Sequence, residues 1–451
     1  MKIELGNPVV FIGPNNSGKT TALQALALWD IGVKRWIEKR GFKETPSQRP
    51  GVTINRRDLI TIPVPSSKLL WRNLHVRDVQ KRSGKGKAVV TKNVRIDIIV
   101  SGVSEGKAWQ CGLEFDYHSE EAFYCRPLRK SENDDFERMP VPQEIENLRL
   151  AFLQPMSGLA ANETRLFDMG AINVRLGEGR TAEVLRNLCY QITNLNDNKE
   201  KWNKIYRRIF ELFGVYLDEP ELNEIRGEIT MTYRDRKGVS FDLSSTGRGL
   251  QQTLLLLAFL SLNPNSVLLL DEPDAHLEIL RQRQIYQILT ESATEQGSQI
   301  IAASHSEVIL NEAADRDVVV AFVGKPHRID DRGSQLLKSL KEIGFDQYYQ
   351  AEQTGWVLYL EGSTDLAILR ALSEILHHKS KSLFERPFVY YVQNQPNAAR
   401  SHFRGLVEAK PDLVGYALFD HLNVLLKQTD ELTEYMWNRT EIENYIFSRE
   451  S

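Results

Sequence analysis

The sequence of 451 residues lacks long hydrophobic runs and has only three cysteines. Its longest apolar stretch, Leu254–Leu262, is too short to cross a bilayer and contains Ser261, which argues against a membrane-spanning helix. Cys111, Cys125 and Cys189 are too few and too scattered for a disulfide framework or a zinc site, so we expect reduced, structural thiols. The N-terminus lacks the pattern of a signal peptide. A cytoplasmic protein with no membrane partner is therefore expected.

The sequence also lacks an excess of basic charge. Its formal net charge is -3, from 57 basic and 60 acidic residues, so any contact with DNA must come from a local patch. One candidate is the basic, glycine-containing stretch Lys81–Lys92, preceded by Trp71, Arg72, His75 and Arg77. Such a stretch can follow a phosphate backbone or form a solvated hairpin tip, and the second is the more common.

A phosphate-binding motif lies close to the N-terminus. The apolar run Val9–Ile12 precedes GPNNSGKT at Gly13–Thr20, and apolar residues at helical spacing follow. In such loops backbone N–H groups surround phosphate oxygens, and the next helix directs its positive end at the same anion. Lys19 would bind the β and γ phosphates of ATP, and Thr20 would ligate Mg²⁺. The predicted nucleotide-binding residues of the loop are Gly13, Asn16, Gly18, Lys19, Thr20 and Thr21.

A buried strand downstream ends in two acids. Val267–Glu272 reads VLLLDE. Asp271 would complete the magnesium shell, and Glu272 would polarise the attacking water. The strand end therefore supplies what ATP hydrolysis needs beside the phosphate-binding loop.

Other segments resemble parts of ABC-type ATPases. LSSTGRGLQQ at Leu243–Gln252 resembles the signature segment, DAHL at Asp274–Leu277 resembles the D-loop, and the segment around His305 resembles the histidine switch. Gln154 stands where a Q-loop glutamine would, between the Walker A and signature segments.

The ABC resemblance implies a head-to-tail homodimer, or a higher oligomer built from it. ATP on one subunit would be covered by Ser245, Gly247 and Gly249 of the other. His305 would sense the γ-phosphate, and Gln154 would link metal and water to the inserted region. Either Ser244 or Ser245 can make the phosphate contact.

Acids also follow strands in the last hundred or so residues. LYLEGSTD places Glu361 after a strand and Asp365 at a helix start, and the strand Gly415–Phe419 ends at Asp420. Glu443 lies near the terminus. Hard divalent cations choose oxygen ligands, so these acids can form a metal cluster. An acidic turn with a helix cap is the alternative.

The C-terminal pattern resembles a Toprim domain, and an ABC-type ATPase followed by Toprim resembles the OLD (overcoming lysogenization defect) family of prokaryotic nucleases, which includes antiphage defence effectors. The resemblance implies that Glu361 is a catalytic acid and metal ligand. Asp365 and Asp420 would be further ligands, and Glu443 would support a second metal. Paired Mg²⁺ or Mn²⁺ ions can activate water for phosphodiester cleavage of DNA. Leu422 departs from the pattern, because it replaces the second acid of the usual Asp-x-Asp pair.

Two principal functions stay open. The chain is either an ATP-regulated, metal-dependent DNA endonuclease of antiphage defence, or an ATPase sensor or scaffold that resembles RecF and SMC heads. In the second case a degenerate Toprim domain would act with a separate effector protein. A nucleotide-gated assembly that hardly turns ATP over is a third possibility.

The alternation of strands and helices predicts an α/β protein. It would comprise an ABC-type P-loop ATPase head with inserted antiparallel strands and a helical segment, followed by a smaller Toprim-like α/β domain. The helical segment can be a pair of core helices or a dimerisation segment, and it has too few heptads for a long coiled coil. The predicted ranges are 1–323 for the ATPase domain, 52–126 for its inserted strands, 181–213 for the helical segment, 324–355 for a connector and 356–451 for the Toprim-like domain.

Overall fold

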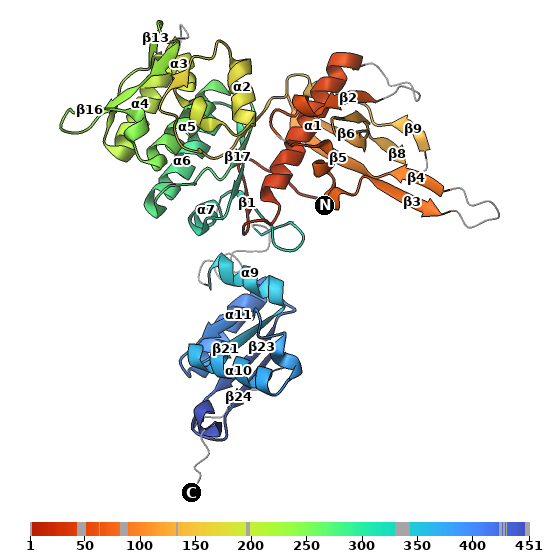
Figure 1. Ribbon diagram of the computed structural model, residues 1–451, viewed down its shortest axis with the longest axis vertical. Coiled ribbons are helices and arrows are strands. Elements are labelled where there is room, and N and C mark those ends of the chain that lie inside the picture. The colour runs from red at the N-terminus through yellow and green to blue at the C-terminus, as the bar shows by residue number, and fades with distance from the viewer. Residues whose placement is uncertain are drawn as a thin grey trace. The chain divides into compact units, whose positions relative to one another are not determined.

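The computed structural model describes residues 2–42, 51–62, 64–81, 89–131, 134–194, 199–314, 316–329, 343–423, 426, 429 and 431–446. The chain divides into two compact units. The larger unit comprises residues 7–9 and 18–304, and the smaller comprises residues 1–6, 10–17 and 305–451. Figure 1 labels their helices and strands. Among the residues in these ranges, no helix is both long and apolar enough to cross a membrane.

A parallel sheet lies at the centre of the larger unit. Its strands are β10 (Leu150–Leu153), β17 (Val267–Asp271) and β18 (Gln299–Ser304), paired in this order. The middles of β17 and β18 are buried, as expected for a parallel sheet covered on both faces. The helices α1 (Lys19–Arg40) and α6 (Ile279–Glu295) contact these strands. This arrangement confirms the predicted α/β class.

The predicted antiparallel strands form a second sheet of the larger unit. They are β2 (Val52–Asn55), β5 (Arg95–Ser104), β6 (Lys107–Tyr117) and β7 (Ala122–Pro127), in the order β2-β7-β6-β5. Helix α1 packs against them, where the indole N–H of Trp29 donates to the carbonyl oxygen of Cys111 at 3.0 Å. Two short hairpins accompany this sheet in the sequence. β3 (Arg77–Lys81) pairs with β4 (Val89–Asn93) between β2 and β5, and β8 (Arg129–Ser131) pairs with β9 (Asp134–Arg138) after β7.

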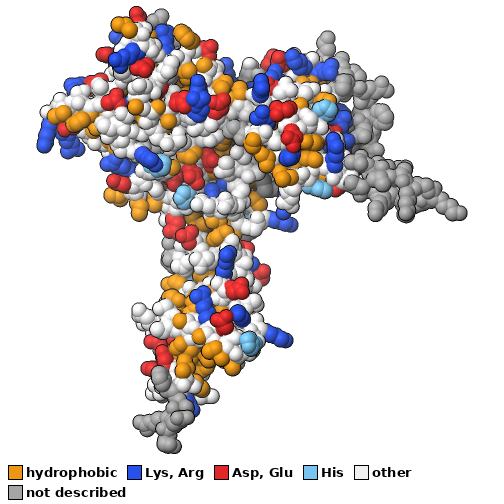
Figure 2. Space-filling view, viewed as in Figure 1, with side chains coloured by type: hydrophobic (Ala, Val, Ile, Leu, Met, Phe, Trp, Pro, Cys, Tyr) orange, Lys and Arg blue, Asp and Glu red, His pale blue; other side chains and the backbone are white. Residues whose placement is uncertain are grey.

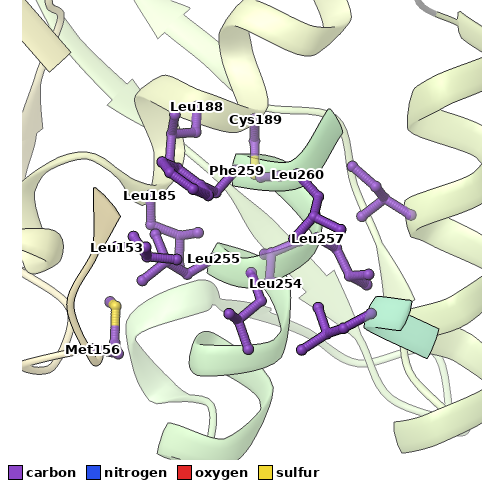
Figure 3. Close-up of a cluster of buried hydrophobic side chains, with 14 of the residues drawn as sticks. Leu153, Met156, Leu185, Leu188, Cys189, Leu254, Leu255, Leu257, Phe259 and Leu260 are labelled. Atoms are coloured by element: carbon purple, nitrogen blue, oxygen red, sulfur yellow. The ribbon is translucent and has the colours of Figure 1, made fainter. Parts of the chain in front are cut away.

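The predicted helical segment forms α3 (Leu185–Asn194) and α4 (Lys199–Phe213). Its apolar residues are buried in the core around α5 (Arg248–Leu262), and Figure 3 shows Leu185 and Leu188 of α3 beside the leucines of α5. Trp202, Ile205 and Ile209 of α4 belong to the same core. The apolar face that suggested a dimerisation segment is thus covered by the chain itself, which favours a pair of core helices.

Shorter elements complete the larger unit. They are α2 (Met169–Gly177) and two small antiparallel sheets: β11 (Glu163–Thr164), β14 (Glu228–Thr230) and β13 (Glu221–Asn223), and β12 (Tyr216–Leu217), β15 (Thr232–Arg234) and β16 (Ser240–Asp242). The three cysteines are free and buried, as the sequence predicted.

The smaller unit contains most of the P-loop strand β1 (Val9–Ile12), whose first residue belongs to the larger unit. Strand β19 (Val318–Ala321) lies between β1 and β20 (His327–Arg328), and the amide of Phe322 donates to the carbonyl oxygen of Ile12 at 2.7 Å. Helix α7 (Glu307–Ala313) precedes β19.

The last hundred or so residues form a four-stranded parallel sheet in the order β22-β21-β23-β24. Helices α9, α10 and α11 accompany it. Apolar residues of α9 and α11 form one core with the inner face of the sheet, whereas α10 contacts β21 and buries only Ser373. The bounds are α9 (Phe345–Thr354), β21 (Trp356–Leu360), α10 (Ser363–Ile375), β22 (Val389–Tyr391), α11 (Pro396–Ala409), β23 (Val414–Phe419) and β24 (Leu432–Met436).

This part differs from the expectation at one boundary. Phe345–Thr354 falls in the predicted connector, yet it is a helix that packs on the C-terminal sheet. Phe345, Tyr348 and Ala351 are buried, and the Gln347 side chain bonds His402 of α11. The helical spacing of these buried residues was not recognised in the sequence, because the residues around them are charged or typical of turns.

Candidate functional site

The P-loop connects β1 to α1. Gly18 directly precedes α1 with φ of 100°, a conformation that a Cβ atom would strain. No side chain caps this end of the helix, and its first turn contains no acid. The main-chain N–H groups of the turn therefore suit an anion, as the motif predicted. Asn16 also has a positive φ, of 64°, and Thr21 is exposed in the first turn of α1.

Lys19 and Thr20 lie beside the acids at the carboxyl end of β17. The Lys19 side chain is only 5% exposed, and this burial lowers the pKa of its amine. Glu272, Asp271 and Asp274 oppose that shift, because their charges favour the ammonium ion. Lys19 therefore stands among three carboxylates, which a phosphate would replace as the partner of its positive charge.

The Thr20 hydroxyl donates to both carboxylate oxygens of Asp271, at 3.1 and 3.0 Å. Burial raises the pKa of Asp271, and the hydrogen bond from Thr20 works against that shift. A hydroxyl and a carboxylate side by side are oxygen ligands of the kind that Mg²⁺ prefers. The residues predicted to hold magnesium in the ATP site are thus brought together.

The chain turns sharply after Asp271. Glu272 has a positive φ of 45°, and its amide donates to the carbonyl oxygen of Ala303 in β18 at 2.8 Å. This bond to the neighbouring strand holds the main chain of Glu272 at the edge of the sheet. A non-glycine residue in this conformation is uncommon and is often found where a side chain must be aimed.

Gln252 is a site residue that the sequence analysis did not single out. It is 1% exposed on α5, where its side-chain oxygen accepts from the amide of Met156 at 2.7 Å. Its side-chain nitrogen donates to the carbonyl oxygen of Pro273 at 3.4 Å. One buried amide thus joins α5 to the segment after Gln154 and to the loop after Glu272. Gln252 is the last residue of the predicted signature segment, Leu243–Gln252, but no sequence motif assigns it a role.

The predicted signature residues lie at the start of α5. The Ser245 hydroxyl donates to the carbonyl oxygen of Asp242 at 2.7 Å, and Gly247 precedes the first turn of the helix without a side-chain cap. A Cβ atom on Gly249 would approach the carbonyl oxygen of His276 to 3.2 Å. The small residue therefore lets α5 pack closely against the predicted D-loop.

Gln154 and His305 are the other residues predicted to act on the nucleotide. Gln154 donates to the carbonyl oxygen of Gly177 at 3.4 Å and lies beside Gly179. His305 follows β18 and belongs to the smaller unit, together with Gly13 and Asn16. Their roles toward nucleotide stay predictions.

In the C-terminal sheet, two predicted acids meet through an asparagine. The Asn394 side-chain nitrogen donates to Glu361 at 2.6 Å and to Asp420 at 3.0 Å. Its side-chain oxygen accepts from the amide of Asp420 at 3.0 Å. The three residues follow β21, β22 and β23, whose carboxyl ends share one edge of the sheet. Asn394 carried no motif and was missed.

Asp420 changes the acidity of Glu361. A hydrogen bond with Asp420, burial, and the charges of Asp420 and Asp365 together raise the pKa of Glu361 to about 7, while Asn394 works to lower it. Two carboxyl groups this close favour sharing a proton over carrying two negative charges. A divalent cation would relieve the same repulsion.

The larger predicted set of metal ligands is not assembled in this structure. The Asp365 carboxylate accepts from the amide of Gly362 at 3.0 Å; Gly362 is the N-cap of α10, and Asp365 lies in the first turn, so the alternative of an N-cap at Thr364 or Asp365 is wrong about the residue. Glu443 lies in the 3₁₀ helix Ile442–Tyr445. Leu422 packs against the core of this sheet. Within the described part of the chain, no three or more His, Cys, Asp or Glu side chains are grouped so as to hold a metal ion.

The predicted basic stretch is described only in part, since residues 82–88 lie outside the described ranges. Its ends belong to β3 and β4, and the Arg77 guanidinium lies 5.8 Å from the centre of the Tyr117 ring. On the face shown in Figure 2, basic and acidic side chains are interspersed.

Residues 102–311 match the model of a protein family described as "AAA domain, putative AbiEii toxin, Type IV TA system". The matched range includes Gln154, Leu243–Gln252, Asp271, Glu272 and His305, and it begins after the P-loop. Together with the P-loop strand and the parallel sheet, the match shows a P-loop ATPase domain. None of the curated proteins matches the chain.

Several solved structures are similar to the chain, all at low identity. An SMC head domain from Thermotoga maritima has 16% identity, with 72% of this chain and 92% of that chain covered and a TM-score of 0.35. An SMC head domain from Pyrococcus furiosus, bound to the C-terminal domain of ScpA, has 14% identity, coverages of 75% and 93%, and a TM-score of 0.34. CbiO1 from Clostridium perfringens, part of an ABC transporter complex, has 13% identity, coverages of 71% and 75%, and a TM-score of 0.27.

Proposed function

We propose that the chain is an ABC-type ATPase that works as a head-to-tail homodimer and regulates a Toprim-like, metal-dependent DNA endonuclease. The observation that carries the ATPase half is the contact of Thr20 with both oxygens of Asp271, next to the buried Lys19. The proposal places the protein in antiphage defence, as the resemblance to the OLD family implies.

The residues of the ATP site divide the work of hydrolysis. Lys19 would exchange its present carboxylate partners for the β and γ phosphates, and Thr20 with Asp271 would hold Mg²⁺. Bound Mg²⁺ neutralises charge that develops on the phosphates. Glu272, whose main chain is fixed to β18, would orient and polarise the attacking water.

The second subunit would complete this site. Ser245, Gly247 and the uncapped start of α5 present a hydroxyl and main-chain N–H groups, which are ligands for a phosphate. His305 would sense the γ-phosphate, and Gln154 would link the site to the inserted strands. In this arrangement nucleotide binding and dimer closure are one event.

The nuclease half of the proposal depends on Glu361 and Asp420. Their contact through Asn394 shows that the pair already accommodates a donor between the carboxylates, and Mg²⁺ or Mn²⁺ would take that place. A bound divalent ion supplies an activated water and stabilises the leaving oxygen of a phosphodiester. DNA is the proposed substrate, and the ends of the basic stretch in β3 and β4 are candidates for contacting its backbone.

A second function is favoured by Leu422. This residue packs against the core where Toprim domains usually carry an acid, and the described residues contain no group of three or more side chains arranged to hold a metal ion. The chain would then be an ATPase sensor or scaffold with a degenerate Toprim-like domain, and a separate effector protein would act on the target.

A plasmid-cleavage assay in Mg²⁺ or Mn²⁺, with and without ATP, separates the two functions. The nuclease proposal expects cutting or nicking that disappears in Glu361→Ala and persists in Glu374→Ala, which changes an exposed glutamate of α10. Unchanged cleavage by purified Glu361→Ala would reject the catalytic role of Glu361. Wild-type protein that hydrolyses ATP but leaves plasmid intact would support the sensor or scaffold.

The ATPase half is tested by Glu272→Gln. We expect this variant to bind ATP, to lose hydrolysis and to accumulate as a dimer, because water is no longer polarised while the phosphate site is intact. Light scattering after gel filtration measures the dimer. If mutant and wild type release nucleotide equally slowly, the protein is a nucleotide-gated switch that hardly turns over.

A further inference from the structure

A buried arginine lies behind the signature segment. Arg186, on α3, is 1% exposed, and its guanidinium donates to the carbonyl oxygen of Ala160 at 2.8 Å and to the carboxylate of Asp242 at 2.9 Å. Burying an arginine is costly unless its donors are paired. Two of its three nitrogens are bonded in this way, whereas Nε is buried without a hydrogen-bond partner among the described residues, and Nη1 also lies 3.9 Å from the Glu163 carboxylate. The guanidinium is therefore a fixed part of the core, with Nη2 directed at Asp242.

Glu163 holds the helix that carries Arg186. This carboxylate is 1% exposed and accepts from the main-chain amides of Arg186 at 2.9 Å and of Asn187 at 2.6 Å, and from the Asn187 side chain at 2.8 Å. Burial raises the pKa of Glu163, and these hydrogen bonds oppose the rise. The start of α3, and with it Arg186, is thus anchored independently of Asp242.

Asp242 in turn organises the signature segment. Its carboxylate accepts from the Ser244 amide at 2.8 Å and from the Ser244 hydroxyl at 2.5 Å, and it caps the 3₁₀ helix Leu243–Ser245. Its carbonyl oxygen accepts the Ser245 hydroxyl. Ser244 is therefore used by the cap, and Ser245 is the hydroxyl bound only to a main-chain oxygen and near the Tyr233 hydroxyl at 3.5 Å.

The negative charge of Asp242 would by itself disfavour phosphate binding at the start of α5. A carboxylate a few residues before α5 would repel the phosphates that the same helix start is proposed to receive. Burial would raise the pKa of Asp242, but the bonds from Ser244 and the pairing with Arg186 lower it, so this carboxyl stays ionised. Arg186 supplies the opposite charge from the buried side.

We infer that Arg186 is a positioning residue of the composite ATP site, which through Asp242 fixes the signature segment and offsets its negative charge. This inference rests on the proposed function. It also assigns Ser245, and not Ser244, to the phosphate contact that the sequence left open. The position of α3 is thereby coupled to the surface that covers the partner's nucleotide.

The test compares three variants of the full-length protein. They are Arg186→Met, Arg186→Lys and the double variant that combines Arg186→Met with Asp242→Asn. The control is Arg175→Met, which removes an arginine from a partly exposed ion pair with Glu183. We measure kcat and KM for ATP, the binding of a fluorescent ATP analogue to the monomer, and ATP-driven dimerisation in the Glu272→Gln background.

Arg186→Met should lower kcat roughly tenfold, the scale of one lost charge-assisted hydrogen bond, and weaken dimerisation, while binding of the analogue to the monomer stays near wild type. Arg186→Lys should recover part of kcat because it keeps the charge. The double variant should also have a higher kcat than Arg186→Met, because an asparagine at position 242 can still accept from Ser244 without repelling phosphate.

Two results would overturn the inference. One is wild-type kcat and dimerisation in Arg186→Met. The other is an equal loss in Arg186→Met and the double variant, with analogue binding falling in parallel, since that pattern shows a role in folding alone. Lack of ATP turnover by the wild type together with lack of ATP-driven dimerisation by Glu272→Gln would instead reject the proposed function itself.

Discussion

Replacing Asp420 with asparagine should make Glu361 a stronger acid. Asp420 contributes both a hydrogen bond and a negative charge to the raised pKa of Glu361, which is about 7 compared with an ordinary value of 4.5. At pH 6, a carboxyl group with a pKa of about 7 is roughly 90% protonated, and one with a pKa of about 4.5 is roughly 3% protonated. The substitution should therefore shift Glu361 toward the ionised form at that pH, while burial and the charge of Asp365 keep part of the rise.

Side-chain ¹³C NMR of the full-length protein measures this change, with the Glu361 signal assigned from its absence in Glu361→Gln. Asp412→Asn is the matched control, because Asp412 is an exposed acid of the same unit that pairs with Lys410. The reasoning is refuted if wild-type Glu361 titrates near 4.5, or if Asp420→Asn leaves its titration unchanged.

The same shift gives two pH dependences. Below pH 7 a divalent ion must displace the shared proton, so Mg²⁺ or Mn²⁺ affinity measured by calorimetry should rise by up to about tenfold per pH unit and level off above pH 7. Because the pKa of folded Glu361 lies above its unfolded value, the folded state binds more protons between about pH 4.5 and 7. Stability should fall as pH rises through that window, by less than about 1 kcal/mol after solvent screening of this exposed group.

Three substitutions test the ATPase domain. Thr20→Val keeps the shape of the side chain but removes the hydroxyl that bonds Asp271. Mg²⁺ affinity in the presence of ATP should therefore fall roughly 10- to 100-fold, with little change in melting temperature. The same Mg²⁺ dependence of ATP hydrolysis in both proteins would contradict the proposed magnesium site. Gln252→Leu leaves the Met156 amide without its bond and should cost about 1–3 kcal/mol in denaturant unfolding, whereas no cost would show that the bond is dispensable. Leu254→Ala removes a fully buried side chain of α5 and should cost about 3–5 kcal/mol in the same assay; a loss under about 1 kcal/mol would disagree with the packing of this core.

Strands bounded by clear breakers were predicted accurately from the sequence. Val9–Ile12 ends at a glycine, and Trp356–Leu360 follows one, so apolar pattern and turn chemistry agree on both elements. Elements that depend on tertiary packing were harder. Helix α11 and strand β24 have mixed composition, and Arg400 of α11 forms two 2.6 Å bonds with the buried Glu434 of β24. Such a pair has no local signature.

The site shows the same division. The P-loop and the acids after β17 were found because fixed spacing along one segment encodes them. Gln252, Asn394 and Arg186 act across segments far apart in the sequence, and an amide or a buried arginine carries no motif. The four predicted metal ligands are not grouped together among the described residues, and their role stays a prediction. Asp365 is used by its own helix, since a cap is satisfied locally before any distant ligand can compete for the carboxylate.

Helix α5 carries both the predicted signature residues and Gln252. Its 15 residues span about 22 Å, and nearly all of them are buried, so it can move only as one body. At one end it would contact the nucleotide of the neighbouring subunit, while Gln252 contacts the loop after Glu272 in its own subunit. ATP bound at one site then changes the ATP affinity of the other site by some factor. The second ATP must change the affinity of the first site by the same factor, because free-energy coupling between two ligands is reciprocal. In a symmetric dimer, ATP binding at the two sites should therefore be coupled, and its Hill coefficient should differ from one.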